Sequence, residues 1–179
     1  SLEKMQNLDF FMNLYRKENF LINLYAAESW DSEENILFLD PDIYNSENNE
    51  WTREVRGRVL KPTAQEAKKE FFESSFNVTY DKEKSFVHIS VDHISPYVAQ
   101  NWNEFIVERI NQEIKQYDFD KTNQELQYLK NSLSLPEFSS IQDSIALLII
   151  SKINKLAEIE SSPYYAFEYV QKAYVPERI

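Results

Sequence analysis

Apolar and polar residues alternate between Phe86 and Asp92, as they do in a strand with one buried face. One side of the alternation carries Val87, Ile89 and Val91, and the other carries His88, Ser90 and Asp92. A second run, Phe76 to Tyr80, precedes it and is separated from it by a polar turn. The two runs therefore predict a β-hairpin.

A long helix is predicted directly after the hairpin. Ser95 is placed to cap free backbone amides, and Pro96 suits the first turn of a helix. No proline or glycine follows before Leu133, and apolar residues recur at helical spacing. These residues are Val98, Trp102, Ile106, Ile110, Ile114, Leu126, Leu129 and Leu133.

The apolar stripe of this helix changes sides. At roughly 100° per residue, Leu126 lies about 180° around the axis from Tyr117. We therefore expect the first half to lie on the sheet and the second half to pack against the segment that returns after Pro136. A straight helix with a local kink at residues 118–120 is the alternative.

Shorter patterns predict the other elements. They are an amphipathic helix from Leu2 to Tyr25 with a break near residues 17–19, a loop beginning at Trp30, a short strand from Ile36 to Leu39, a surface loop from Asn45 to Glu50, a helix opened by a capping box at Thr63 to Glu66, and a strand from Tyr164 to Val175. The expected class is α+β, with a small mixed sheet and packed helices forming a base, and a long protruding α-helical hairpin. We expect a single domain over residues 1–179, with the base at 1–115 and 160–179 and the hairpin at about 116–159.

The run Ile145 to Ile150 is apolar on all sides, which is typical of a helix that is buried all round. Within a slim hairpin such a helix needs a second surface. Either a neighbouring copy of the chain or the base of the same chain would supply one, and the sequence leaves both possibilities open. The run is far shorter than the ~20 residues that span a bilayer.

Composition narrows the possible partners. The chain has 179 residues with a formal net charge of −11 and a pI of about 4.7, so a phosphate backbone would be repelled and nucleic acid is not an expected partner. It contains no cysteine and a single glycine, Gly57, which favours a helix-rich fold with few tight turns. Cations cluster at Arg53, Arg56, Arg58 and Lys61, either as a patch for an anionic ligand or to neutralise nearby acidic helices.

No motif indicates catalysis, a metal or a cofactor. The two histidines, His88 and His93, fall on opposite faces of the predicted strand, and no third metal ligand is evident. With 30 acidic residues, some pair of carboxylates will always lie near glycosidase spacing, so that spacing has little specificity. We therefore expect no enzyme, with no catalytic, cofactor-binding or metal-binding residues.

Two segments resemble the Wzz family of bacterial polysaccharide chain-length determinants, which are polysaccharide co-polymerases. Phe86 to Glu113 is similar to the family's strand-to-helix segment through Val87, Val91, Asp92, Pro96, Ala99 and Trp102. The chain's end is similar to the family's closing strand through Tyr165, Ala166, Phe167, Val170, Ala173, Pro176 and Glu177. Gln171 and Lys172 depart from the usual Asp-Pro.

The resemblance implies a regulator of the chain length of O-antigen or a related surface glycan. It implies the periplasmic domain of a bacterial inner-membrane protein, without the family's transmembrane segments, that forms a ring-like homo-oligomer and acts as a scaffold with the membrane polysaccharide polymerase. Contact with the lipid-linked glycan stays open. From their positions, the candidate interface residues are Arg109, Lys115, Ile145, Ile149 and Lys152. The alternatives are a carbohydrate-active enzyme with paired carboxylates and a helical adaptor protein.

Overall fold

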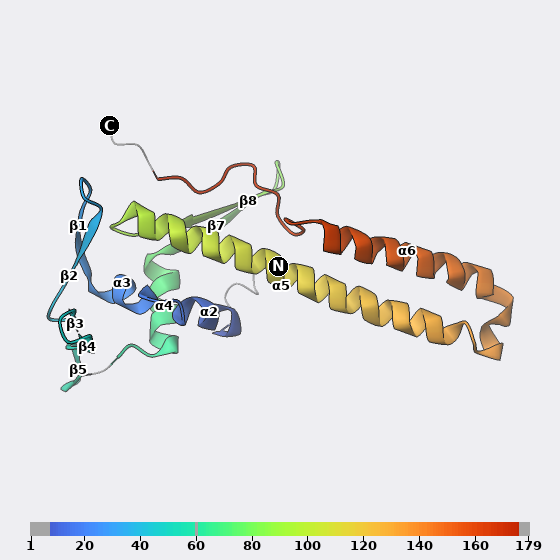
Figure 1. Cartoon of the computed structure of the whole chain (residues 1–179), viewed down its shortest axis with the longest axis horizontal. Coiled ribbons are helices and arrows are strands. Elements are labelled where there is room, and N and C mark those ends of the chain that lie inside the picture. The colour runs from blue at the N-terminus through green and yellow to red at the C-terminus, as the bar shows by residue number, and fades with distance from the viewer. Residues whose placement is uncertain (1–7, 60, 176–179) are drawn as a thin grey trace. The chain divides into compact units, whose positions relative to one another are not determined.

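The computed structural model describes residues 8–59 and 61–175 (Figure 1). In chain order the elements are α2 (Leu8–Tyr15), α3 (Phe20–Ala26), β1 (Ala27–Asp31), β2 (Ile36–Leu39), β3 (Tyr44–Asn45), β4 (Glu50–Trp51), β5 (Glu54–Val55), β6 (Arg58–Val59), α4 (Ala64–Ser74), β7 (Phe76–Asp81), β8 (Phe86–Val91), α5 (Pro96–Ser132), the 3-10 helix η1 (Pro136–Ile141) and α6 (Gln142–Ser161). The chain is therefore α+β with a long helical hairpin, as predicted.

Within the described residues the strands form four separate two-stranded antiparallel ladders, β1–β2, β3–β4, β5–β6 and β7–β8. The prediction of one small mixed sheet is wrong, because each described strand pairs only with its neighbour in the sequence. Such pairs need no crossover and are closed by short turns.

The strongest sequence pattern gives the longest ladder. The β7–β8 register runs from Phe76 opposite Val91 to Asp81 opposite Phe86, as the alternation predicted. The carboxylate of Asp81 accepts the backbone N–H groups of Glu83 and Lys84 and so fixes the turn. Residues along β8 alternate between half-buried and exposed.

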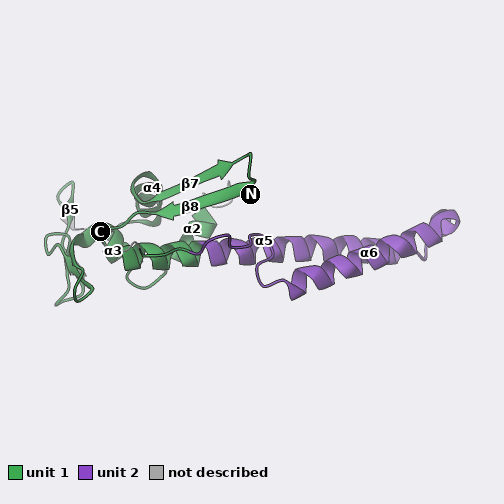
Figure 2. Cartoon of the chain, turned by 90° about the horizontal axis from the view of Figure 1, so that it is seen from above, with its two compact units in different colours: residues 1–106, 173–179 green, residues 107–172 purple. Residues whose placement is uncertain are grey.

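The chain divides into two compact units, which Figure 2 colours separately: residues 1–106 with 173–179, and residues 107–172. Helix α5 runs through the boundary between them, which falls after Ile106. The first unit has an aromatic core. Phe20 lies 4.8 Å from Trp102 and 5.6 Å from Phe71 between ring centroids, and Phe71 lies 5.7 Å from Trp102.

Local signals set the helix ends in the first unit. Asn19 adopts a left-handed φ of 61° between α2 and α3, which confirms the predicted break. Thr63 and Glu66 form the predicted capping box at the start of α4. The hydroxyl of Ser95 accepts the N–H of Val98 at the start of α5. Residues 2–7, the first part of the predicted N-terminal helix, lie outside the residues that the structure describes.

Two sequence predictions are wrong. Trp30, expected to begin a loop, lies inside β1 and pairs with Leu37 of the predicted strand β2. Residues 164–175, expected to form a strand, pair with no strand. The side chain of Asn111 supplies part of the hydrogen bonding that a partner strand would have given. Its amide oxygen accepts the N–H groups of Ala166 and Phe167 at 3.0 and 2.9 Å.

The second unit contains most of α5 together with η1 and α6, and α6 runs back alongside α5 (Figures 1 and 2). Leu126 of α5 and Ile145 and Ile159 of α6 are buried. Ile110 and Leu126 of α5 are both buried although they lie about 160° apart around the axis at roughly 100° per residue, so the buried side does change along α5. The predicted pairing of the second half of α5 with the returning segment is therefore confirmed.

Left-handed backbone conformations mark several turns. Besides Gly57, five residues in the described part of the chain have a positive φ, and three of them are asparagines. They are Asn19, Asn35, Asn49, Arg56 and Ser85. In a chain with one glycine, asparagine takes much of the role that glycine usually has in turns.

Candidate functional site

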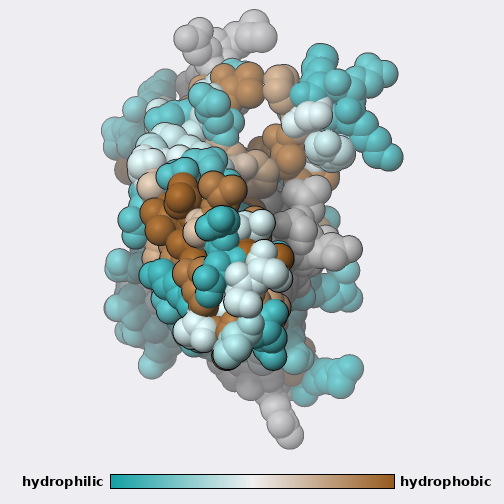
Figure 3. Space-filling model, turned by 90° about the vertical axis from the view of Figure 1, so that its right-hand side faces the viewer, coloured by the Kyte–Doolittle hydropathy of each residue, from teal (hydrophilic) through white to brown (hydrophobic). Residues whose placement is uncertain are grey.

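One side of α6 is apolar and exposed. Leu148 is 50% exposed beside it, and Leu147, Ile150 and Ile153 have 68%, 55% and 48% of their surface accessible. These three residues are spaced by three along the helix, so they are neighbours on its surface. We call them the α6 apolar face. Figure 3 views the end at which α5 and α6 are joined, and hydrophobic surface gathers there on one side among hydrophilic atoms.

The structure turns the predicted interface inward at two positions. Ile145 is only 5% exposed and Ile149 is half-buried, so Ile145 offers almost no surface to a neighbour. The sequence showed that α6 is apolar all round but could not show which side meets α5. That contact leaves the α6 apolar face, and not Ile145, on the outside.

Two of the three predicted cations, Lys115 and Lys152, are hydrogen-bonded within the second unit, and Arg109 has only longer contacts. Lys152 pairs with Glu125 across the hairpin. Lys115 donates to the backbone carbonyls of Glu160 and Ser162 at 3.1 and 2.9 Å. These are carbonyls at the end of α6, where a cation also suits the helix dipole. Arg109 lies 3.6 Å from Glu113.

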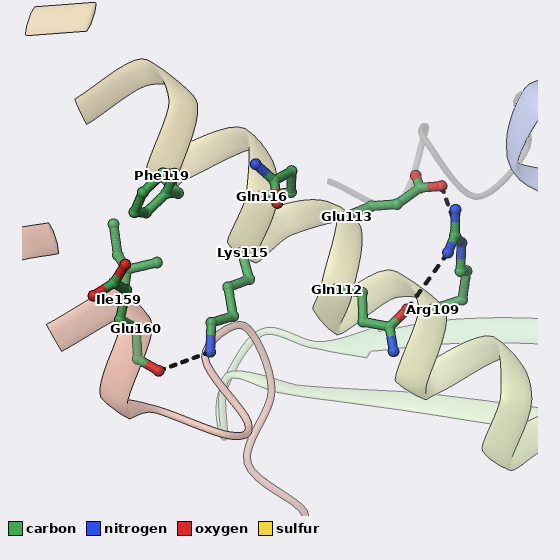
Figure 4. Close-up of a pocket in the computed structure, with 8 residues that line it drawn as sticks. All are labelled: Arg109, Gln112, Glu113, Lys115, Gln116, Phe119, Ile159 and Glu160. Atoms are coloured by element: carbon green, nitrogen blue, oxygen red, sulfur yellow. Dashed lines mark hydrogen bonds and ion pairs between the residues drawn. The ribbon is translucent and has the colours of Figure 1, made fainter. Parts of the chain in front are cut away.

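An open groove of about 580 Å³ lies where α6 ends against α5 (Figure 4). It is lined by Arg109, Gln112, Glu113, Lys115, Gln116 and Phe119 from α5 and by Ile159 and Glu160 from α6. We call it the α5–α6 groove. Two of the five predicted residues, Arg109 and Lys115, therefore come together here, although they were expected to meet a second copy.

The sequence analysis missed Gln112 and Gln116. With Arg109 and Glu113 they occupy positions i, i+3, i+4 and i+7 of α5, which places all four on one face of the helix. That spacing is visible in the sequence. Polar residues at helical spacing, however, usually form a solvated face, and only the end of α6 turns this one into a groove.

The first unit holds the residues weighed as an anionic-ligand patch. Arg53 makes two 3.1 Å contacts with the carboxylate of Glu66. The backbone N–H of Thr63, and after it Arg53, hold the pKa of Glu66 below its usual value. Burial, reinforced by Glu66 and Glu70, raises the pKa of the nearby Tyr25 to about 12. Arg56 is exposed, and the side chain of Arg58 lies outside the described residues. The neutralising role therefore accounts for Arg53.

The two histidines have different surroundings. His88 is exposed on β8. His93 is partly buried against Trp102, its Nδ1 accepts the N–H of Ser95 at 2.9 Å, and its Nε2 lies 2.9 Å from the carbonyl of Asn23. Burial lowers the pKa of His93. Among the described residues no group of three or more His, Cys, Asp or Glu is placed to hold a metal ion.

Comparison with known proteins gives no relative: no family model, no curated protein and no solved structure matches the chain. In the described residues no single helix is long and apolar enough to cross a membrane, whereas α5 taken with the segment Pro136–Ser161, as a pair bent by 106°, meets the same length and composition test.

Proposed function

We propose that this chain is the periplasmic domain of a regulator of surface-polysaccharide chain length. In this proposal it performs no catalysis and acts as an oligomeric scaffold beside an inner-membrane polymerase. The proposal is supported by the resemblance of Phe86 to Glu113 to the Wzz family and by the strand-to-long-helix arrangement of that segment, β8 followed by α5. The long helical hairpin agrees with the same reading.

The observation that carries the proposal is the α6 apolar face. Three large aliphatic side chains in adjacent positions expose about half or more of their surface. Grouped apolar surface of this kind is typical of sites that another molecule covers. A second copy is the proposed occupant, in line with the ring that the Wzz resemblance implies. Copies with a net charge of −11 repel one another, and burial of this apolar face would offset that repulsion.

The function is tested first in cells. A strain that lacks the full-length gene is compared with the same strain carrying it on a plasmid, and surface polysaccharide is separated on a gel. We expect the preferred chain-length band to collapse into a random ladder without the gene and to return with it. An unchanged band in a strain without a second length regulator would contradict the proposal.

The scaffold is tested with the double variant Ile150→Asp with Ile153→Asp in the full-length protein. Placing two carboxylates on the α6 apolar face should abolish the oligomer in detergent, measured by light scattering, and should collapse the band. The matched control is Gln127→Glu, which adds a charge at an exposed polar position of α5. Normal oligomers in the double variant would show that this face is not the interface.

A further inference from the structure

The α5–α6 groove carries a ladder of hydrogen-bonding groups that the fold leaves mostly unused. Arg109, Gln112, Glu113 and Gln116 follow one another along one face of α5 and line the groove (Figure 4). These side chains carry, in chain order, a guanidinium, an amide, a carboxylate and a second amide. Amides both donate and accept hydrogen bonds, a guanidinium only donates and a carboxylate only accepts. The groove therefore offers both kinds of partner within two turns of helix.

The contacts within this ladder are long. The Nε atom of Arg109 is buried and has no hydrogen-bond partner, and the nearest carboxylate oxygen, that of Glu113, lies 3.6 Å away. The Nη1 atom of Arg109 reaches the amide oxygen of Gln112 only at 3.5 Å. Only Gln116 makes a short contact, by donating to Asp120 at 2.9 Å. Hydrogen bonds weaken at such lengths, so the exposed amide of Gln112 and the partly exposed remainder of the Arg109 side chain retain capacity for a ligand, whereas the buried Nε itself is not accessible.

Beside the ladder the groove has an apolar wall, and its accessible part is the ring of Phe119, which packs beside Ile159. Phe119 of α5 is half-buried, and Ile159 of α6 is fully buried. In Figure 4 the Phe119 ring and Ile159 lie at one end of the groove, and Arg109 and Glu113 lie at the other. A ligand along the groove would therefore meet apolar surface at one end and paired polar groups at the other.

The charges of the groove balance. Arg109 and Lys115 are opposed by Glu113 and Glu160. Lys115 is also occupied by two backbone carbonyls, which leaves it poorly available to an anion. Since the whole chain is strongly acidic, a charged polyanion would be repelled, and a neutral ligand is favoured.

We propose that the α5–α6 groove binds a short stretch of neutral glycan. Sugar hydroxyls both donate and accept hydrogen bonds and so match a ladder of amides, carboxylate and guanidinium, while the apolar face of a sugar ring matches Phe119. The volume of about 580 Å³ falls within the range of roughly 300–1,000 Å³ typical of small-molecule sites. The choice of the cell's own surface polysaccharide as the source of this glycan rests on the proposed function.

The test uses lipid-free surface polysaccharide from the source bacterium, cut to short oligosaccharides and separated by anion exchange into neutral and acidic fractions. Each fraction is titrated into the full chain, and the side-chain amide signals of Gln112 and Gln116 are followed by NMR. We expect the neutral fraction to shift both signals and its affinity to change little with salt. Binding of the acidic fraction alone, lost as salt rises, would overturn the proposal.

Variants separate the groove from the rest of the helix. Gln112→Ala with Gln116→Ala should weaken binding of the neutral fraction about tenfold, because two hydrogen-bonding side chains are lost. Phe119→Leu keeps an apolar wall but removes the ring, and should weaken binding severalfold. The matched control, Gln124→Ala with Gln127→Ala, removes two exposed amides elsewhere on α5 and should leave affinity unchanged. Equal affinity in the groove and control variants would overturn the proposal.

The outcomes distinguish this inference from the proposed function. If deleting the gene leaves the polysaccharide band unchanged but the neutral fraction binds through Gln112 and Gln116, the groove stands and the length-control function fails. If the band collapses on deletion but neither fraction shifts these signals, the function stands and the groove proposal fails.

Discussion

The two units differ in how completely they bury their apolar side chains. In the first, aromatic rings from α2, α3, α4 and α5 pack on one another, and Phe11, Phe20, Phe71 and Trp102 are almost completely buried. In the second, α6 buries Ile145 and Ile159 against the hairpin and leaves the α6 apolar face exposed. The contrast teaches that the first unit closes an aromatic core, although it also exposes single apolar side chains such as Phe38 and Ile94, whereas α6 of the second unit exposes several apolar side chains next to one another.

The largest expected effect is in the aromatic core. Trp102→Ala should lower the free energy of unfolding by about 3–5 kcal/mol, because it removes a large buried side chain that touches Phe20 and Phe71. Urea unfolding of the 179-residue chain measures it. Ile150→Ala, on the α6 apolar face, should change that free energy by less than about 0.5 kcal/mol. Equal losses at the two sites would remove the contrast between the units.

A smaller effect on stability is expected where Asn111 of α5 holds the chain that follows α6. Asn111→Ala leaves the N–H groups of Ala166 and Phe167 without their acceptor, at a cost of about 1–3 kcal/mol. Hydrogen exchange at residues 166 and 167 should accelerate accordingly. Asn123→Ala, at an exposed position of α5, is the control and should leave both rates unchanged. Unaltered exchange in Asn111→Ala would mean that this side chain does not anchor the segment.

Removing the N-terminal cap of α4, in the first unit, should lower the free energy of unfolding by a still smaller amount. Thr63→Ala removes the hydroxyl that accepts the N–H of Glu66 and should cost about 1 kcal/mol in urea unfolding. Thr63→Ser keeps the hydroxyl and should recover most of that loss. If serine and alanine were equally destabilising, the loss would come from the threonine methyl group and not from the cap.

The smallest effect concerns pH. Burial lowers the pKa of His93 below its unfolded value, so the unfolded chain binds the proton more readily than the folded chain. Stability is therefore complete above the unfolded pKa of about 6.5 and declines as pH falls from there toward the folded pKa. Urea unfolding from about pH 5 to 7 should show this slope, and His93→Asn should flatten it. An unchanged slope in the variant would assign the pH dependence to other groups.

The sequence predicted elements whose cause is local. The alternation at Val87, Ile89 and Val91, the capping box at Thr63 and the Ser95-Pro96 start of α5 all act within a few residues, and the structure has each of them. The strand expected at 164–175 depends on a distant partner, which no local pattern reveals. Trp30 was missed for the same reason, because β1 exists only by pairing with β2.

The candidate sites were predictable only in part. The sequence identified α6 as over-apolar, but the contact with α5 decides that Ile145 faces inward and Ile150 outward. It selected Arg109 and Lys115 for their charge, whereas their place in the groove depends on where α6 ends. Gln112 and Gln116 had no signal beyond a polar helical face. Helix-to-helix packing, which sequence periodicity does not fix, accounts for all of these differences.

The asparagines in left-handed turns have a consequence for the unfolded chain. Glycine at positions 19, 35 and 49 would relieve local backbone strain, but it would also give the denatured ensemble more conformational entropy to lose on folding. These two effects oppose each other. With asparagine at these turns and a single glycine in 179 residues, the unfolded chain samples fewer backbone states, so the turns begin folding from a narrower distribution.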